Sequence, residues 1–469
     1  MATLPPDEAL AVQLGRAADA AAGPTLEVDP RGAAPAVDPG TLGCVVLTAP
    51  LEEVGDPLPV LRTIRGWLAP GGTLVCAVGN FTDQRSLVQL LRSDPQAAPL
   101  GVVPPGLAHV HGYATAYKLL LEAGWSPEIV EVVADEVDEA LLEAAGPLLE
   151  HLRVHPDRAV RHLSARRYVF AARPIDDLVE GDAGAPLTFV ACVNDDAQLH
   201  HNLLASPCLG EGSPHEVLLY RDMGSAAEGL NRGIREASHD LVVLVQQDVY
   251  LPSWWPSRLH RQWAAASPVD EPAVGGPVGV RYREGGRTHV GHCIDRDALF
   301  RTDHALPAEV DGLDEVLMVV PKASDLRFDP ALGWHLYGTD LALQAHAAGR
   351  RTVALDVPCH HNSLLSGLHG AYHHAETVLA EKWPGELPIV TNSTTIDQDP
   401  RALRTVALEQ ALREAKSTTD ELSARIATLD RELGEVRQAV AEREAVIASM
   451  QASPFWKLRT IVARAVKGG

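Results

Sequence analysis

The chain has 469 residues, 46% of them apolar and 22% charged, a composition that favours folded domains over disorder. Its 40 Lys and Arg against 62 Asp and Glu give a formal net charge of −22, which argues against nucleic acid as a partner. A chain of this length is too long for a single hydrophobic core, so about three domains are expected.

The chain lacks the sequence signals of an exported or membrane-spanning protein. Residues 1–8 have neither the basic start nor the apolar run of a signal peptide. No stretch reaches the roughly 18 apolar residues that a membrane span needs. The six cysteines are scattered without a Cys-x-x-Cys spacing, so neither a thiol zinc site nor a disulfide framework is expected. We expect a cytoplasmic protein.

Residues 1–178 alternate short apolar runs with helical spacing, which predicts an α/β domain. The runs Gly43-Cys-Val-Val-Leu-Thr-Ala49 and Thr73-Leu-Val-Cys-Ala-Val78 are typical of buried strands. The polar stretch 180–186, which contains glycine and acidic residues, marks the boundary to a second domain.

Three segments of the first domain carry a family resemblance. They are Leu51-Glu-Glu-Val-Gly-Asp-Pro57, Leu68-Ala-Pro-Gly-Gly-Thr-Leu-Val75 and Leu120-Leu-Glu-Ala-Gly-Trp125. In this order they resemble the second half of a class I methyltransferase. The resemblance implies a partial Rossmann-like methyltransferase fold.

The cofactor site of that family depends on a glycine-rich turn. The resemblance places this turn before Glu27, which matches the family's ribose-binding acid. Only Gly15 and Gly23 occur before Glu27, and a side chain in the turn would fill the space of the cofactor. We therefore predict a degenerate methyltransferase-like domain that serves interaction or scaffolding and does not bind S-adenosylmethionine. An active methyltransferase with a differently built cofactor site stays the alternative.

In the second predicted domain, residues 186–396, acidic and imidazole side chains follow apolar strands. An apolar strand at 241–245 runs directly into Asp248, a helical pattern contains Asp340, and a late strand leads to two adjacent histidines, His360 and His361. Transfer of a sugar from a nucleotide diphosphate needs a divalent metal on hard oxygen ligands, often with an imidazole. It also needs a carboxylate that acts as general base on the acceptor hydroxyl. These residue types occur here in that order.

Six consecutive elements of this domain carry a second family resemblance. They are Glu216–Ser225, Ala226–Ala237, Leu241–Asp248, Val310–Val320, Arg327–Leu343 and Thr352–Ser363. Together they resemble the family 2 glycosyltransferases, which implies a GT-A fold. Gln246 stands where the family has the first Asp of its Asp-x-Asp motif, as in a subgroup with Gln-Asp-Val. The replacement removes one charge from the expected metal site.

The resemblance implies individual roles for residues of this domain. The metal, manganese or magnesium, is expected on Asp248 and His360, with His361 as the alternative ligand, and the general base is expected at Asp340. The expected donor-binding residues are Asn194, Asp222, Asn231, Gln246 and Asp248, and those on the acceptor side are Asp314, Trp334 and Tyr337. A plain helix cap at Asp340 and core packing of the aromatic residues stay open as alternatives.

Residues 402–452 carry apolar side chains at heptad spacing. One seam contains Leu408, Leu422, Leu429 and Val436, and a second contains Leu412, Ile426, Leu433 and Val440. The pattern predicts a coiled coil and a homodimer, and a long helix folded back on its own chain is the alternative. Residues 453–469 are basic and aromatic, so they could dock on the anionic inner face of a membrane or pack as a plain helix end.

These features predict a glycosyltransferase that moves a sugar from a nucleotide-sugar to a glycan or lipid-linked acceptor. The resemblance implies inversion, metal dependence and a place in cell-surface polysaccharide or glycoconjugate biosynthesis. The rival hypothesis is a catalytically inactive scaffold of a glycan-biosynthesis complex. Gln246 and the missing glycine-rich turn favour the scaffold.

Overall fold

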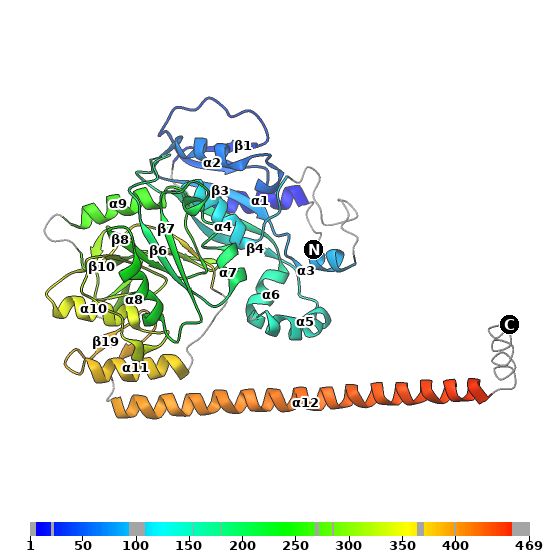
Figure 1. Ribbon diagram of the computed structural model, residues 1–469. Coiled ribbons are helices and arrows are strands. Elements are labelled where there is room, and N and C mark those ends of the chain that lie inside the picture. The colour runs from blue at the N-terminus through cyan, green and yellow to red at the C-terminus, as the bar shows by residue number, and fades with distance from the viewer. Residues whose placement is uncertain are drawn as a thin grey trace, which may run out of the picture. The chain divides into compact units, whose positions relative to one another are not determined.

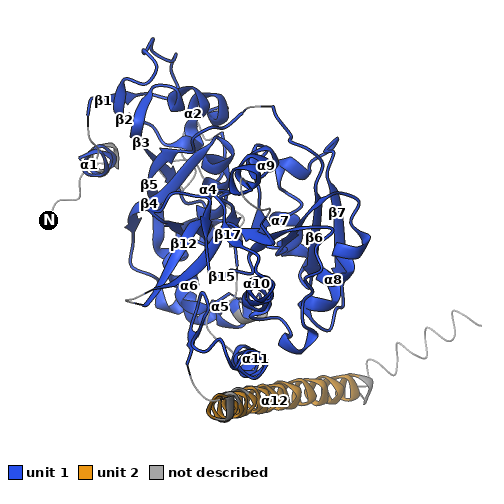
Figure 2. Cartoon of the chain, turned by 90° about the vertical axis from the view of Figure 1, so that its left-hand side faces the viewer, with its two compact units in different colours: residues 1–400 blue, residues 401–469 orange. Residues whose placement is uncertain are grey.

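The protein is seen here in a computed structural model, which describes residues 6–19, 23–92, 108–152, 154–179, 181–267, 272–283, 286–363, 370–397 and 400–452. The chain divides into two compact units, residues 1–400 and 401–469, coloured blue and orange in Figure 2. The first unit is a mixed α/β structure, as predicted, and it holds the candidate site.

The N-terminal lobe, residues 6–179, is built on a five-stranded sheet in the order β1-β2-β3-β5-β4. The strands are β1 (Thr25–Val28), β2 (Leu42–Leu47), β3 (Leu68–Gly79), β4 (Trp125–Ala134) and β5 (Ala165–Pro174). The pairs β1-β2 and β2-β3 are parallel, and β5 is antiparallel to both of its neighbours. The helices are α1 (Pro6–Ala18), α2 (Pro57–Arg65), α3 (Gln84–Leu91), α4 (Tyr113–Glu122), α5 (Glu139–His151) and α6 (Pro156–Ser164), with a short 3-10 helix, η1 (Leu51–Glu53).

Helices cover both faces of this sheet, which explains the continuous apolar runs of β2 and β3. Val46 and Val75 pack with Leu10 and Leu14 of α1 on one face. The residues that alternate with them pack with α2 and α4 on the other face. Glu27 lies within β1 itself, and the described residues before β1 form only α1. The described chain thus enters the sheet without an earlier strand and glycine-rich turn.

The central lobe, residues 181–397, is built on two larger sheets (Figure 1). The seven-stranded sheet has the order β14-β17-β10-β16-β8-β6-β7, and β6 is parallel to β7 and β8. Its strands are β6 (Thr188–Val193), β7 (Glu216–Arg221), β8 (Leu241–Val245), β10 (Val274–Gly276), β14 (Ala308–Glu309), β16 (Leu317–Pro321) and β17 (Thr352–Ala354).

The second sheet of the central lobe has the order β15-β11-β12-β18-β9, and β13 pairs with β12. Its strands are β9 (Val249–Tyr250), β11 (Val278–Arg283), β12 (Gly286–Asp295), β13 (Ala298–Arg301), β15 (Gly312–Leu313) and β18 (His360–His361), and a hairpin forms β19 (Ile389–Val390) and β20 (Thr395–Ile396). The helices are α7 (Asp196–His201), α8 (Ala226–Glu236), α9 (Trp255–Ala266), α10 (Tyr337–Ala347) and α11 (Gly370–Lys382), with 3-10 helices η2 (Pro207–Leu209) and η3 (Pro330–Leu332).

The two lobes share one hydrophobic core. Tyr117 and Phe170 of the N-terminal lobe belong to the same buried cluster as Phe189 and Trp255 of the central lobe. The indole Nε1 of Trp254 donates to Leu121 O across the junction at 3.0 Å. The two predicted α/β domains therefore form a single compact unit.

The second unit contains α12 (Pro400–Ala452), an uninterrupted helix of 53 residues. Its heptad side chains are exposed in the single chain, with Leu412 at 72% and Ile426 at 61%. The coiled-coil pairing of this helix stays a prediction. The basic segment 453–469 lies outside the described residues, and none of the described helices is long and apolar enough to cross a membrane.

Candidate functional site

A cavity of about 390 Å³ lies beside the carboxyl ends of the parallel strands β6 and β8. This edge is where ligands bind in open α/β sheets, because the loops that follow the strands diverge there. Five of the residues predicted from the sequence line it: Asn194, Gln246, Asp248, Trp334 and Tyr337. The structure thus brings together residues from three separate parts of the chain.

A carboxylate of the cavity lining, that of Asp248, lies beside the imidazole of His361. Oδ1 of Asp248 lies 3.6 Å from Nε2 of His361. The Oε1 of Gln246 lies 3.2 Å from the same Nε2. On the other side of the ring, Nδ1 donates to Oδ1 of Asp295 at 2.8 Å. Asp295 therefore fixes the orientation of the imidazole and leaves its Nε2 directed at Asp248 and Gln246.

The charge of His361 follows from these carboxylates. Burial alone lowers the pKa of the imidazole, but the charges of Asp248, Asp295 and Asp314 outweigh burial and raise its pKa to about 9. In turn, burial would raise the pKa of Asp295, and the hydrogen bond from His361 outweighs this effect and lowers it. His361 is thus a protonated, positively charged imidazole among the carboxylates of Asp248, Asp295 and Asp314.

The adjacent His360 faces the opposite way. Its side chain is fully buried, and its ring stacks on Tyr117 of the N-terminal lobe at 5.5 Å between ring centroids. Its Nε2 donates to Arg296 O at 3.0 Å. Burial lowers the pKa of His360 to about 3, so the ring is neutral. Of the two histidines left open by the sequence, the structure places His361, not the preferred His360, against Asp248.

Asp340, the predicted base, is a buried carboxylate that accepts hydrogen bonds from three side chains. It has no exposed surface. Its Oδ1 accepts from Trp383 Nε1 at 2.8 Å, and its Oδ2 accepts from Gln344 Nε2 at 2.7 Å and from Lys382 Nζ at 2.9 Å. Asp340 is the fourth residue of α10 and points towards α11, so it lies outside the cavity lining.

Three further predicted residues also lie outside the cavity lining. Both ends of the Asn231 amide bond the backbone of Phe328, at 2.8 and 2.9 Å, so this side chain fixes a loop to α8. Asp222 is exposed in a left-handed turn, with φ at 57°. Asp314 accepts from Val316 N at 2.9 Å and from Asn392 Nδ2 at 2.8 Å.

Three functional candidates were missed by reasoning from the sequence. Asp295 orients His361, and Asp195 lines the cavity and caps α7. The third, Glu315, lines the cavity beside Tyr337, and its Oε1 accepts from Gly338 N at 3.2 Å. Burial raises the pKa of Glu315 to about 8, helped by the nearby Asp314. Its position next to Asp314, directly before the apolar strand β16, was the signal that could have found it.

Three side chains beside the cavity could supply ligands to one divalent ion. Asp248 offers a carboxylate oxygen, His361 a ring nitrogen and Gln246 an amide oxygen, a mixture that magnesium and manganese accept. Within the described ranges no group of three or more His, Cys, Asp or Glu residues could hold a metal ion. A bound ion would therefore depend on oxygen atoms of the ligand to complete its coordination.

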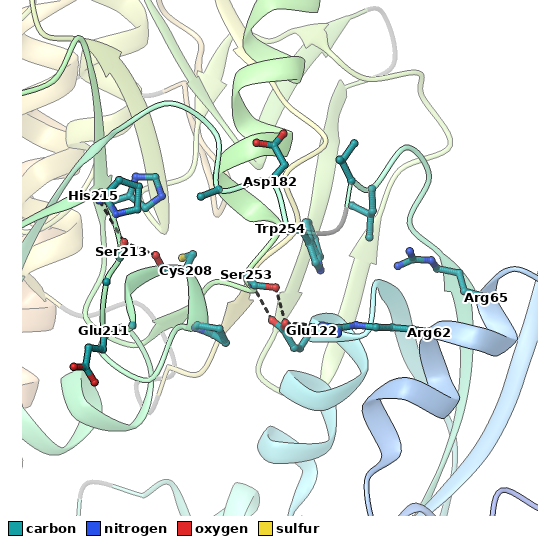
Figure 3. A pocket seen from close by; sticks show the side chains of 18 residues that line it. Arg62, Arg65, Glu122, Asp182, Cys208, Glu211, Ser213, His215, Ser253 and Trp254 are labelled. Atoms are coloured by element: carbon teal, nitrogen blue, oxygen red, sulfur yellow. Dashed lines mark hydrogen bonds and ion pairs between the residues drawn. The ribbon is translucent and has the colours of Figure 1, made fainter.

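A second cavity, of about 310 Å³, lies at the junction of the lobes (Figure 3). Its central polar group is Glu122, which accepts from the backbone N of Ser253 at 2.8 Å and from its hydroxyl at 2.6 Å. Arg62 pairs with the same carboxylate at 3.1 Å. The bonds between Ser253 and Glu122 join the lobes to each other, and none of the residues predicted for the site lies there.

No protein family and no curated protein matches the chain. Parts of it are similar to solved structures. An S-adenosylmethionine-dependent methyltransferase from Mesorhizobium loti is 17% identical over 31% of this chain and 67% of that one, with a TM-score of 0.19. A methyltransferase from Archaeoglobus fulgidus is 14% identical over 29% of this chain and 61% of that one, with a TM-score of 0.19. TarS from S. aureus, in complex with UDP, is 9% identical over 42% of this chain and 65% of that one, with a TM-score of 0.26.

The first two of these structures are methyltransferases, and the chain spans about two thirds of the length of each of the three. At such TM-scores the similarities carry no conclusion about activity. The function of this chain has to be argued from its own site.

Proposed function

We propose that the protein is a metal-dependent glycosyltransferase that takes its sugar from a nucleotide-sugar bound in the 390 Å³ cavity. The observation that carries the proposal is the pairing of His361 at 3.6 Å with Asp248, a residue of the cavity lining. A carboxylate and an oriented imidazole at the carboxyl edge of a parallel sheet suit a divalent ion with a diphosphate bound to it. The acceptor is proposed to be a glycan or a lipid-linked sugar.

Asp248 and His361 would hold the metal, and Gln246 stands within reach as a neutral third ligand. When bound, a divalent ion neutralises the charge that develops on the leaving diphosphate. Asp295 supports this arrangement, because its hydrogen bond from Nδ1 keeps the Nε2 lone pair of a neutral His361 available. Metal binding would displace the proton that His361 carries in the free protein.

Glu315 is our proposed general base, in place of Asp340. A base needs a free lone pair directed at the substrate, and the carboxylate of Asp340 is occupied by three side-chain donors. Glu315 lies on the cavity wall and bonds only backbone N–H groups among its described contacts. Its raised pKa makes the ionised carboxylate of Glu315 a stronger proton acceptor than an ordinary carboxylate.

Trp334 completes the proposed site as an exposed aromatic face. It is 44% exposed and lines the cavity, whereas Tyr337 beside it is 6% exposed. An exposed ring can stack on a sugar or a base, so Trp334 is proposed as a platform for the substrate. Tyr337 packs edge-on against Phe328 at 5.7 Å and belongs to the wall.

Calorimetric titration with the uridine, guanosine, adenosine, cytidine and thymidine diphosphates tests the proposal. We expect one of them to bind in the presence of Mn²⁺ and to lose at least about tenfold in affinity when Mn²⁺ is removed or Asp248 is changed to Asn. S-adenosylmethionine, titrated in parallel, is expected not to bind. Absence of nucleotide binding with and without metal would reject the proposal and favour the scaffold.

A further inference from the structure

The segment that carries His361 is held from two sides. Towards the central lobe, Asn362 N donates to Asp248 O at 2.9 Å, and β18 pairs with β9. Towards the N-terminal lobe, the same segment contacts α4 and α6. Residues 360–363 therefore lie between the cavity and a lobe that is remote in sequence.

Helix α4 supplies two contacts. The ring of Tyr117 stacks on His360 at 5.5 Å with an interplanar angle of 22°. One turn earlier, the Tyr113 hydroxyl donates to Oδ1 of Asn362 at 2.8 Å. The residues before and after His361 are thus both fixed by α4. The imidazole of His361 itself stays free of the lobe and is directed at Asp248.

Helix α6 adds a cation. The guanidinium of Arg158 donates to Oδ1 of Asn362 at 3.1 Å, and it also donates to Ser363 O and to the Tyr113 hydroxyl. Hydrogen bonds from a charged donor are stronger than neutral ones, and partial burial of the guanidinium strengthens them further. Ser363 lines the cavity, so Arg158 bonds a residue of the cavity wall from the side of the N-terminal lobe.

From these contacts we infer that the N-terminal lobe is a positioning module for the catalytic site, acting through Tyr113, Tyr117 and Arg158. The inference rests on the proposed function, because the position that is held is that of a proposed metal ligand. The three side chains hold the residues on both sides of His361, through the side chains of His360 and Asn362 and the backbone of Ser363, and so they set the distance between its Nε2 and Asp248. In this role the N-terminal lobe acts through side chains of its helices α4 and α6, and it does not require S-adenosylmethionine.

The energetic scale of such support is known from other metal sites. Loss of a group that orients a metal ligand costs about ten- to a hundredfold in metal affinity. Arg158 and Tyr113 act on His361 through Asn362 and Ser363, so the lower end of that range is expected. We expect the double variant Tyr113→Phe, Arg158→Gln to bind its nucleoside diphosphate with Mn²⁺ about tenfold more weakly.

The matched control is Arg161→Gln on the same helix. Arg161 pairs with Asp297 at 2.6 Å and also bridges the lobes, but within the described part of the chain its contact with the central lobe is to Asp297 and not to the segment 360–363. If docking of the lobes in general mattered, both variants would weaken binding. If the held segment matters, only the change at Arg158 and Tyr113 does so.

Two measurements on the full-length protein separate this inference from the proposed function. The first is hydrogen–deuterium exchange of the peptide that contains Asn362, without any ligand. We expect about tenfold faster exchange in the double variant, and wild-type exchange in Arg161→Gln, with thermal unfolding of all three to confirm that they are folded. The second is titration of Mn²⁺ with the nucleoside diphosphate that wild type binds.

Faster exchange together with weaker Mn²⁺-dependent binding in the double variant alone supports the inference. Unchanged exchange of the Asn362 peptide overturns it, whatever the nucleotide result. Faster exchange with unchanged binding also overturns it, since the segment would then be held without effect on the site. If wild type binds none of the five nucleoside diphosphates, the proposed function fails and so does the positioning role, while the exchange result still reports whether the lobe holds the segment.

Discussion

Nε2 of His361 lies 3.6 Å from Oδ1 of Asp248, while its neighbour His360 stacks on Tyr117 in the opposite direction. The two histidines are the two residues of β18, and successive side chains of a strand point to opposite faces. One face of β18 is turned to Asp248 and the other to Tyr117 of the N-terminal lobe. A pair of adjacent histidines is thereby divided into a candidate ligand and a packing residue.

The division predicts unequal effects of two neighbouring substitutions. His361→Ala removes the imidazole beside Asp248, and Mn²⁺-dependent binding of the nucleoside diphosphate should fall by at least about tenfold. His360→Phe keeps a ring stacked on Tyr117 and should bind as wild type does. Calorimetric titration of both variants decides the assignment. Loss of binding in His360→Phe with retention in His361→Ala would reverse it.

Much of the fold followed from patterns that the sequence displays locally. The apolar runs of β2, β3, β6 and β8 are buried strands because both faces of their sheets are covered. The packing of the two lobes into one unit could not be predicted from such local patterns. It depends on contacts such as that between Trp254 and Leu121, which join residues 133 positions apart and leave no periodic signal.

Substitution of Asp340 should affect stability rather than ligand binding. Asp340→Asn removes a buried charge from the three donors Trp383, Gln344 and Lys382, and loss of one partner of a buried ion pair costs about 3 kcal/mol. The free energy of unfolding in urea should fall by this order while Mn²⁺-dependent nucleotide binding persists below the transition. A fully stable Asp340→Asn protein without turnover would restore the assignment of Asp340 as the base.

The opposite behaviour is expected at Glu315. Glu315→Gln keeps the shape of the side chain and the contact with Gly338 N, but it cannot accept a proton from the acceptor. Turnover should fall roughly 100-fold with nucleotide binding unchanged. The free energy of unfolding should not decrease. Above the ordinary pKa of 4.5 the unfolded chain releases a proton that the folded protein keeps on Glu315, so this glutamate destabilises the fold at neutral pH and glutamine does not. Turnover equal to wild type would exclude Glu315 as the base.

The residues that follow a strand could be placed at the site from the sequence, whereas the orientation of a residue on a helix could not. Asn194 directly follows β6 and Asp248 stands in the turn after β8, and both line the cavity. Asp340 has the residue type of a base, yet the register of α10 turns it towards α11 and into a network with Lys382. That register depends on the packing of two helices, which a single sequence does not display.

Acid should weaken the fold through its buried neutral histidines. Burial lowers the pKa of His360 to about 3, with Lys118 and His361 adding to this and Asp295 opposing it. The unfolded chain binds a proton at this imidazole once the pH falls below its ordinary pKa of 6.5, whereas the folded protein binds it only near its lowered pKa of about 3. The stability that is present above pH 6.5 is therefore lost as the pH falls towards 3.

His360→Phe should remove part of this pH dependence. Between pH 8 and pH 5 the contribution of His360 is about 2 kcal/mol, and the variant should lose that much less stability over the same interval. Chemical denaturation at the two pH values measures it. His162, whose pKa burial lowers to about 4, stays in the variant and leaves a residual slope. Equal pH dependence in variant and wild type would show that His360 is not held neutral.

The exposed seam of α12 predicts self-association. Leu412, Ile426 and Leu429 are 72%, 61% and 47% exposed in the single chain, and an isolated helix gains most of its stability from packing of its apolar face. Sedimentation velocity of the full-length protein should show a dimer. Ile426→Glu with Leu429→Glu should give a monomer, because a charge on each seam opposes pairing. Ala424→Glu, two positions before Ile426 and outside both seams, is the matched control and should stay dimeric. A monomeric wild type, or dimers in all three proteins, would show that this helix does not pair through its heptads.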